Sequence, residues 1–165
     1  MSDFSLNGVQ LSIANFQRRT TITPLVLVRT AMRLRISQAD YETMLAHVQA
    51  HWPEEACGLL AGQGEWVRQV YRIENIRHSP VAYEMHALEQ VRAMIEIEAR
   101  GWELRGIFHS HPQGPPVPSA TDIELAYYPE AVYVICSPAE ENAWQARGFR
   151  IEEGQVRPAL LDIET

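Results

Sequence analysis

The chain has 165 residues, of which 46% are hydrophobic and 21% are charged, and its net charge is −7. That length supports one domain with a sizeable core, and the composition excludes a disordered or fibrous chain. All 14 basic residues are arginine; residues 1–36 hold five arginines and one acid, whereas the other 129 residues hold nine arginines and 20 acids. Because phosphate contacts need clustered cations, the acidic body predicts no nucleic-acid partner.

Apolar runs are short throughout the sequence. The longest candidate, 22–28, is broken by Pro24 and is far below the roughly 20 apolar residues of a transmembrane helix. No small-residue cleavage site follows it cleanly, so we expect no secretory signal, no membrane partner and a cytoplasmic protein. Cys57 and Cys136 lie inside apolar runs, which predicts core residues rather than a disulfide or a zinc knuckle.

The first part of the chain differs from the rest. Residues 1–31 are polar, contain several arginines and lack clear periodicity, and Met32 then opens a segment typical of a domain start. We expect an N-terminal extension at 1–31 and one domain at 32–165. Two alternatives stay open for the extension: either it is a tail, even one that precedes a native start at Met32, or Leu25–Val28 adds an edge strand.

From residue 37 the pattern predicts alternating helices and strands. Ser37 and Asp40 have capping-box spacing, so a helix is expected over 37–51. Strands are expected at 57–61 and at 66–73, where apolar and polar residues alternate, with a glycine-containing hairpin turn between them.

A second helix is predicted at 86–100, ending at Gly101. Further strands are expected at 103–109, 131–137 and 143–151, with a helix starting near Ser119 and a last strand at the C-terminus. This element order predicts an α/β domain with a mixed central sheet flanked by helices. The side chains expected to face inward from the second helix are Leu88, Val91, Met94, Ile95 and Ala99.

The stretch with the clearest chemistry begins at His109-Ser110-His111-Pro112. Two histidines at positions i and i+2 of an extended backbone point to the same side, so His109 and His111 can converge on one point. The proline-rich loop that follows can be neither helix nor central strand, and it can carry Asp122 back towards them. Two imidazoles and a carboxylate are typical of catalytic zinc, which keeps one position open.

Each part also has a plain structural interpretation. An isolated His-x-His pair is more often a surface or core pair than a metal site, and the spacing of Ser119 and Asp122 by itself favours a helix cap. Their joint occurrence favours the metal site. Hydrolysis there needs a base, and Glu54 and Glu55 are candidates beside a short apolar strand, although composition alone favours a solvated turn.

The sequence Glu55-Ala-Cys-Gly-Leu-Leu, followed by His-Ser-His-Pro and Ser-Ala-Thr-Asp, resembles the JAMM/MPN+ metalloprotease family, and its small bacterial members in particular. The resemblance covers residues 33 to about 158 and implies a deaminase-like α/β sandwich. It implies that one Zn²⁺ per chain is bound by His109, His111 and Asp122. It further implies that Glu55 is the general acid/base and that Ser119 stabilises the oxyanion, whereas Glu54 matches no functional position.

The resemblance implies a zinc-dependent hydrolase that cleaves a peptide or isopeptide bond. The expected substrate is the C-terminal tail of a ubiquitin-like or sulfur-carrier protein, or an adduct of one, and a homodimer stays open. Three rivals remain: a RadC-like protein linked to DNA repair, a non-haem iron oxygenase and a non-catalytic MPN-type binding module. The acidic body argues against the first, Glu55 against the second and the intact motif against the third.

Overall fold

A computed structural model describes residues 32–139 and 143–165. The expectations for residues 1–31, including an edge strand at Leu25–Val28, lie outside the described residues. Within these two ranges no helix is long and apolar enough to cross a membrane. The elements in chain order are β1 (Arg33–Ser37), α1 (Gln38–Ala50), β2 (Cys57–Gln63), β3 (Trp66–Ile73), α2 (Ala87–Ala99), β4 (Glu103–Ser110), α3 (Ala120–Glu124), β5 (Val132–Pro138), β6 (Trp144–Glu152) and β7 (Gln155–Glu164).

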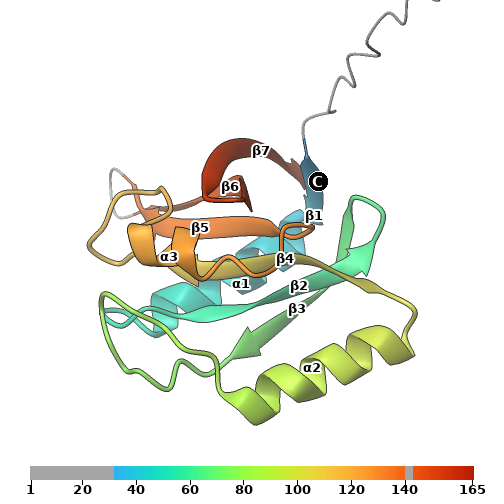
Figure 1. Cartoon of the computed structure of the whole chain (residues 1–165), viewed down its shortest axis with the longest axis horizontal. Helices are drawn as coiled ribbons and strands as arrows, with labels where there is room; N and C mark the ends of the chain where they lie inside the picture. Colours follow the sequence, from blue (N-terminus) through green and yellow to red (C-terminus); the bar gives the residue numbers. More distant parts are fainter. Residues whose placement is uncertain (1–31, 140–142) are drawn as a thin grey trace, which may run out of the picture.

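The strands form one mixed sheet, which confirms the predicted α/β class. Its order is β1-β3-β2-β4-β5-β6-β7, and it closes on itself because β1 contacts both β3 and β7 (Figure 1). The β1–β7 pair is parallel over five residues, whereas β1 meets β3 only at Arg35 and Trp66. The sequence prediction contained neither β1 nor this closure, since β1 has only five residues and its partner β7 is at the far end of the chain.

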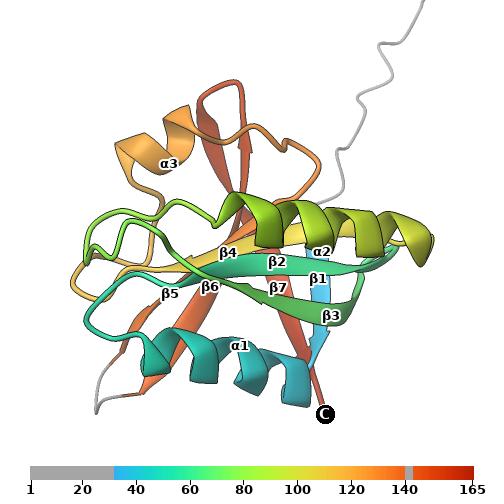
Figure 2. The same ribbon diagram turned by 90° about the horizontal axis from the view of Figure 1, so that it is seen from below.

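The two long helices cover opposite sides of β2, β3 and β4 (Figure 2). Successive residues of a strand face opposite sides of the sheet. On one side, Leu60 and Phe108 pack in a core cluster with Met44 and Val48 of α1. On the other side, Leu59 and Ile107 pack in a second cluster that includes Ala93 of α2. Burial on both faces explains why the strand expected at 57–61 is a continuous apolar run rather than an alternating one.

The predicted helices and strands from residue 37 onward are present, with ends shifted by a few residues. Ser37 caps α1 by accepting the Asp40 N–H at 3.1 Å, and Gly101 ends α2 with a positive φ of 65°. Cys57 and Cys136 are buried free thiols, as expected.

The expected inward face of α2 is wrong. Leu88, Val91 and Ile95 are 62%, 53% and 61% exposed, whereas Ala93 and Ile97 are buried against the sheet. Ala93 and Ile97 are four residues apart and therefore share one face of the helix, and this is the face that is buried. Met94 packs partly against the core and Ala99 is exposed.

Candidate metal centre

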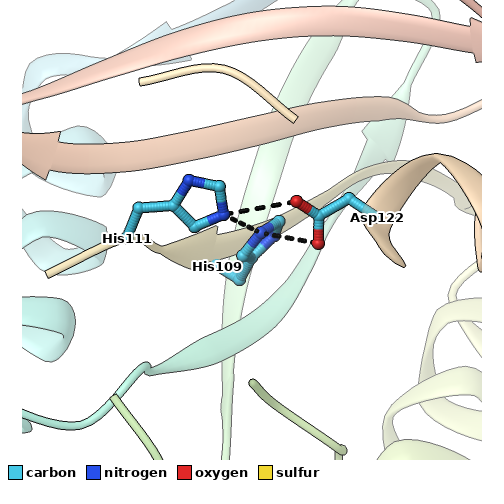
Figure 3. A group of neighbouring side chains, drawn as sticks. All are labelled: His109, His111 and Asp122. Atoms are coloured by element: carbon cyan, nitrogen blue, oxygen red, sulfur yellow. Dashed lines mark hydrogen bonds and ion pairs between the residues drawn. The ribbon is translucent and has the colours of Figure 1, made fainter. Parts of the chain in front are cut away.

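The two histidines of the motif lie where β4 ends. His109 is the penultimate residue of β4 and pairs with Cys57 of β2, and His111 follows the strand. Both side chains lie on the same side of the backbone, and their Nε2 atoms are 3.0 Å apart (Figure 3). His109 is 1% exposed and His111 is 8% exposed. The alternation of an extended backbone therefore brings the two imidazoles together, as predicted.

Asp122 reaches the histidines from the first turn of α3 (Figure 3). Its Oδ1 lies 3.2 Å from His109 Nε2, and its Oδ2 lies 3.2 Å from His111 Nε2. The carboxylate also accepts the Ser119 N–H at 2.6 Å, while Ser119 Oγ accepts the Asp122 N–H at 3.2 Å. This is a complete capping box, so the same contacts that start α3 also orient the carboxylate.

The donor set fits a zinc ion. The three ligand atoms lie within 4.8 Å of one another. The two Nε2 atoms are 3.0 Å apart and each lies 3.2 Å from one oxygen of the Asp122 carboxylate, which is close to the edge, about 3.3 Å, of a tetrahedron with zinc–ligand bonds of about 2.0–2.1 Å. His111 Nδ1 lies 2.9 Å from the Pro115 carbonyl, so it donates there and leaves the Nε2 lone pair for a metal. Among the described residues, this is the one such group of histidine and acidic side chains.

The pKa values of the three residues are shifted in different directions by burial and by their mutual contacts. Burial alone would raise the pKa of Asp122, but hydrogen bonds from His109 and His111 outweigh it and hold that pKa far below its usual range. Burial lowers the pKa of His109, which favours the neutral imidazole. For His111 burial lowers the pKa, but the contacts with Asp122 and the Pro115 carbonyl raise it overall.

Glu55 precedes β2 and is 6% exposed. Burial raises its pKa to about 7; the nearby His111 opposes that change and Asp122 adds to it. With His111, Ser119 and Asp122 it lines one cavity of about 570 Å³. Glu54, in contrast, points to the surface and pairs with His78 at 3.2 Å. The structure thus brings all five predicted site residues to one place and leaves Glu54 outside it.

Comparisons with known proteins agree with this geometry. The family described as prokaryotic homologs of the JAB domain matches residues 37–147. The chain belongs to this family. The matched range contains Glu55, both histidines, Ser119 and Asp122, and it confirms the resemblance to the JAMM/MPN+ proteins.

Individual JAB-domain relatives are similar over most of their length. The chain is 39% identical to the desampylase of Haloferax volcanii over 131 residues, which cover 73% of this chain and 94% of that protein. It is 32% identical to the CysO-cysteine peptidase of Mycobacterium tuberculosis, covering 84% of this chain and 97% of the relative. A solved structure from Desulfitobacterium hafniense is 36% identical, with a TM-score of 0.71 over 79% of this chain and 92% of that one.

Ser110, between the two histidines, was not predicted to have a role. It is fully buried, its hydroxyl accepts the Ala56 N–H at 2.9 Å, and its own N–H donates to the Ala56 carbonyl at 2.9 Å. These bonds fix the strand that carries the histidines relative to the segment that carries Glu55. The sequence did contain a signal for this role. A residue between two side chains that point to the same side of a strand must itself face the opposite side, so a serine there is expected to contact the neighbouring segment.

Asn75 was also missed. It is 4% exposed, and its amide donates to the Glu55 carbonyl at 2.9 Å and the Ala82 carbonyl at 3.1 Å. Its side-chain oxygen accepts the N–H groups of Arg77 and Glu84, each at 3.0 Å. An asparagine in a polar loop gives no sequence signal for this arrangement, since its partners are set by the tertiary fold.

The rest of the cavity is largely apolar and aromatic. Most of its lining comes from two segments, residues 80–85 and residues 113–128. Val81 and Tyr127 are more than 70% exposed, so the mouth of the cavity presents apolar surface to solvent. A bound chain segment can cover such surface beside the three converging ligand atoms.

Proposed function

We propose that this chain is a zinc-dependent hydrolase that cleaves a peptide or isopeptide bond at the C-terminal tail of a ubiquitin-like or sulfur-carrier protein. The observation that carries the proposal is the convergence of His109, His111 and Asp122, of which His111 and Asp122 line the same cavity as the buried Glu55. Three protein ligands leave a coordination position open, which is typical of catalytic rather than structural zinc.

The proposed ligands are His109 Nε2, His111 Nε2 and the Asp122 carboxylate. When bound, zinc would supply Lewis-acid chemistry, activating water at neutral pH and polarising the scissile carbonyl. Glu55 would accept a proton from the attacking water and later donate it to the leaving amine. Its pKa of about 7 in the metal-free protein suits a group that both accepts and donates a proton near neutral pH.

Ser119 would donate a hydrogen bond to the carbonyl oxygen as negative charge develops there. Its Oγ already accepts the Asp122 N–H, so the hydroxyl is oriented by the helix cap and its proton is left to donate. A preorganised donor of this kind contributes about 3 kcal/mol to transition-state stabilisation. The cap and the catalytic role use different parts of the same hydroxyl and are compatible.

The names of the relatives and the shape of the cavity support the substrate class. A desampylase and a CysO-cysteine peptidase match this chain over nearly their whole length. A protein tail is a thin extended segment, and the open, largely apolar cavity beside Glu55 could hold it. The three strands β5, β6 and β7 take up most of the described residues after the short α3, which favours a small carrier or a peptide substrate over a second protein held by large insertions.

Finer expectations accompany this proposal. We propose that each chain binds one zinc ion and that the fold is a deaminase-like α/β sandwich. We also propose that residues 32–165 form one domain after an N-terminal extension. We also propose a cytoplasmic protein that binds neither nucleic acid nor membrane, with a homodimer left open.

The substrate proposal is tested with carrier proteins extended at the C-terminus. One set carries a single amino acid in peptide linkage, and a second carries a lysine peptide in isopeptide linkage. We expect the zinc-loaded protein to release the carrier with its native C-terminus, detected by intact mass, and Glu55→Gln to release none. If neither set is cleaved by protein that contains zinc, the proposed substrate class is wrong.

A further inference from the structure

Metal-binding histidines are normally oriented through the ring nitrogen that does not bind the metal. That nitrogen almost always donates a hydrogen bond to a carboxylate, a carbonyl or water, which sets the tautomer and the ring plane. His111 follows this rule, since its Nδ1 donates to the Pro115 carbonyl at 2.9 Å. His109 does not: its Nδ1 is buried and has no hydrogen-bond partner in the part of the chain that the structure describes.

The plane of His109 is held by a different contact. The ring of Tyr83 stacks on the imidazole, with ring centroids 4.5 Å apart and planes inclined by 28°. Stacking fixes the orientation of a ring plane without a hydrogen bond. Tyr83 lies on the loop between β3 and α2, which is remote in sequence from the metal-binding motif.

The backbone around Tyr83 is fixed on both sides. The carbonyl of Ala82 accepts a hydrogen bond from the Asn75 amide at 3.1 Å, and the N–H of Glu84 donates to the Asn75 side-chain oxygen at 3.0 Å. The same amide donates to the Glu55 carbonyl at 2.9 Å. Asn75 thus ties the two neighbours of Tyr83 to the segment that carries the proposed base.

We propose that Tyr83 is a positioning residue for His109, its stacked ring replacing the hydrogen bond that orients other metal-binding histidines. The inference rests on the proposed zinc site and adds a residue that the JAMM-like motif does not contain. It attributes the effect to the aromatic ring and not to the phenol hydroxyl. Phenylalanine should therefore serve at this position, whereas an aliphatic side chain of similar size should not.

The test compares zinc affinities of full-length variants by competition with a chromophoric chelator. We expect Tyr83→Leu to weaken zinc binding by about 10- to 100-fold, the usual effect of losing a partner that orients a ligand, and Tyr83→Phe to stay within about threefold of the parent protein. Tyr41→Leu is the matched control. Tyr41 packs on the α1 side of the sheet, so its loss should lower thermal stability without changing zinc affinity.

A second measurement does not depend on a variant that folds. In the metal-free parent protein, the ring protons of His109 should be shifted upfield by the ring current of Tyr83, relative to those of His111. Absence of that shift, a Tyr83→Leu affinity less than tenfold weaker, or an equal loss in Tyr83→Phe would each overturn the inference. If the parent protein itself binds no zinc, the proposed function fails and this inference fails with it; a failure confined to the Tyr83 variants leaves the proposed function standing.

Discussion

Ser110 Oγ accepts the backbone N–H of Ala56 at 2.9 Å, and this bond joins the strand of the two histidines to the residue that follows Glu55. Together with the backbone bond from Ser110 N–H to the Ala56 carbonyl, it sets the spacing between the proposed base and the proposed zinc ligands. Glu55 itself is held from the other side, because its N–H donates to the Ser79 carbonyl at 2.8 Å.

We predict that Ser110→Ala lowers the free energy of unfolding by about 1–3 kcal/mol, because the buried Ala56 N–H loses its acceptor, the Ser110 hydroxyl oxygen. Ser137→Ala is the control. Ser137 is equally buried, but its hydroxyl has no hydrogen-bond partner among the described residues, so its removal should be nearly neutral. Urea denaturation of both variants measures the free energy of unfolding. An equal decrease in the two variants would contradict the proposed role of the Ser110 hydrogen bond.

Glu55→Gln should keep zinc and lose activity. Glutamine retains the shape of the side chain but cannot accept the proton, and general-base catalysis contributes typically 10²–10⁴-fold in rate. Glu54→Gln provides the neighbouring control, since Glu54 pairs with His78 at the surface and should be dispensable. Turnover and zinc content are measured on the same preparations, and near-parental turnover in Glu55→Gln would disprove the base assignment.

Asp122→Ala should lose both zinc and activity. The carboxylate supplies the third proposed ligand and also accepts the Ser119 N–H at 2.6 Å, so its removal damages the metal site and the helix cap together. Glu124→Ala, an exposed acid on the same short helix, should retain both properties. Zinc content after dialysis distinguishes the two variants; metal retained by Asp122→Ala would exclude this residue as a ligand.

Ser119→Ala should lower the rate by roughly 10²–10³-fold while zinc stays bound, because an oxyanion donor is removed. Loss of the helix cap should also cost about 1 kcal/mol of stability. Ser37→Ala removes the equivalent cap of α1, so it should cost a similar stability with no change in rate. If the two variants lose the same activity, the effect of Ser119 is structural.

The stability of metal-free protein should report the burial of Glu55. Burial raises the pKa of Glu55 from 4.5 to about 7, so its contribution to folding is fully present below about pH 4.5 and is lost as the pH rises through 7. Relative to Glu55→Gln, the parent protein should lose up to about 3 kcal/mol across that window. Denaturation of both proteins at pH 4.5, 6 and 8 measures the difference, and a difference that does not change with pH would contradict a buried carboxylate.

The sequence predicted the convergence of the site side chains better than it predicted the fold around them. His109, His111, Ser119 and Asp122 lie within 14 consecutive residues, so strand alternation and a rigid loop determine most of their arrangement. The orientation of α2 was wrong because Leu88, Val91 and Ile95 form an apolar stripe by themselves, and only the tertiary contact with the sheet selects the smaller Ala93 instead. Closure of the sheet by β1, and the partners of Asn75 and Tyr83, likewise depend on contacts between distant segments.

The most direct test of the account is the metal content of the purified protein, measured by elemental analysis beside a His109→Ala/His111→Ala variant. The convergence of both Nε2 atoms with the Asp122 carboxylate predicts close to one zinc per chain in the parent protein and none in the variant. A parent protein without zinc, or zinc that persists in the variant, would contradict a catalytic zinc centre at these residues.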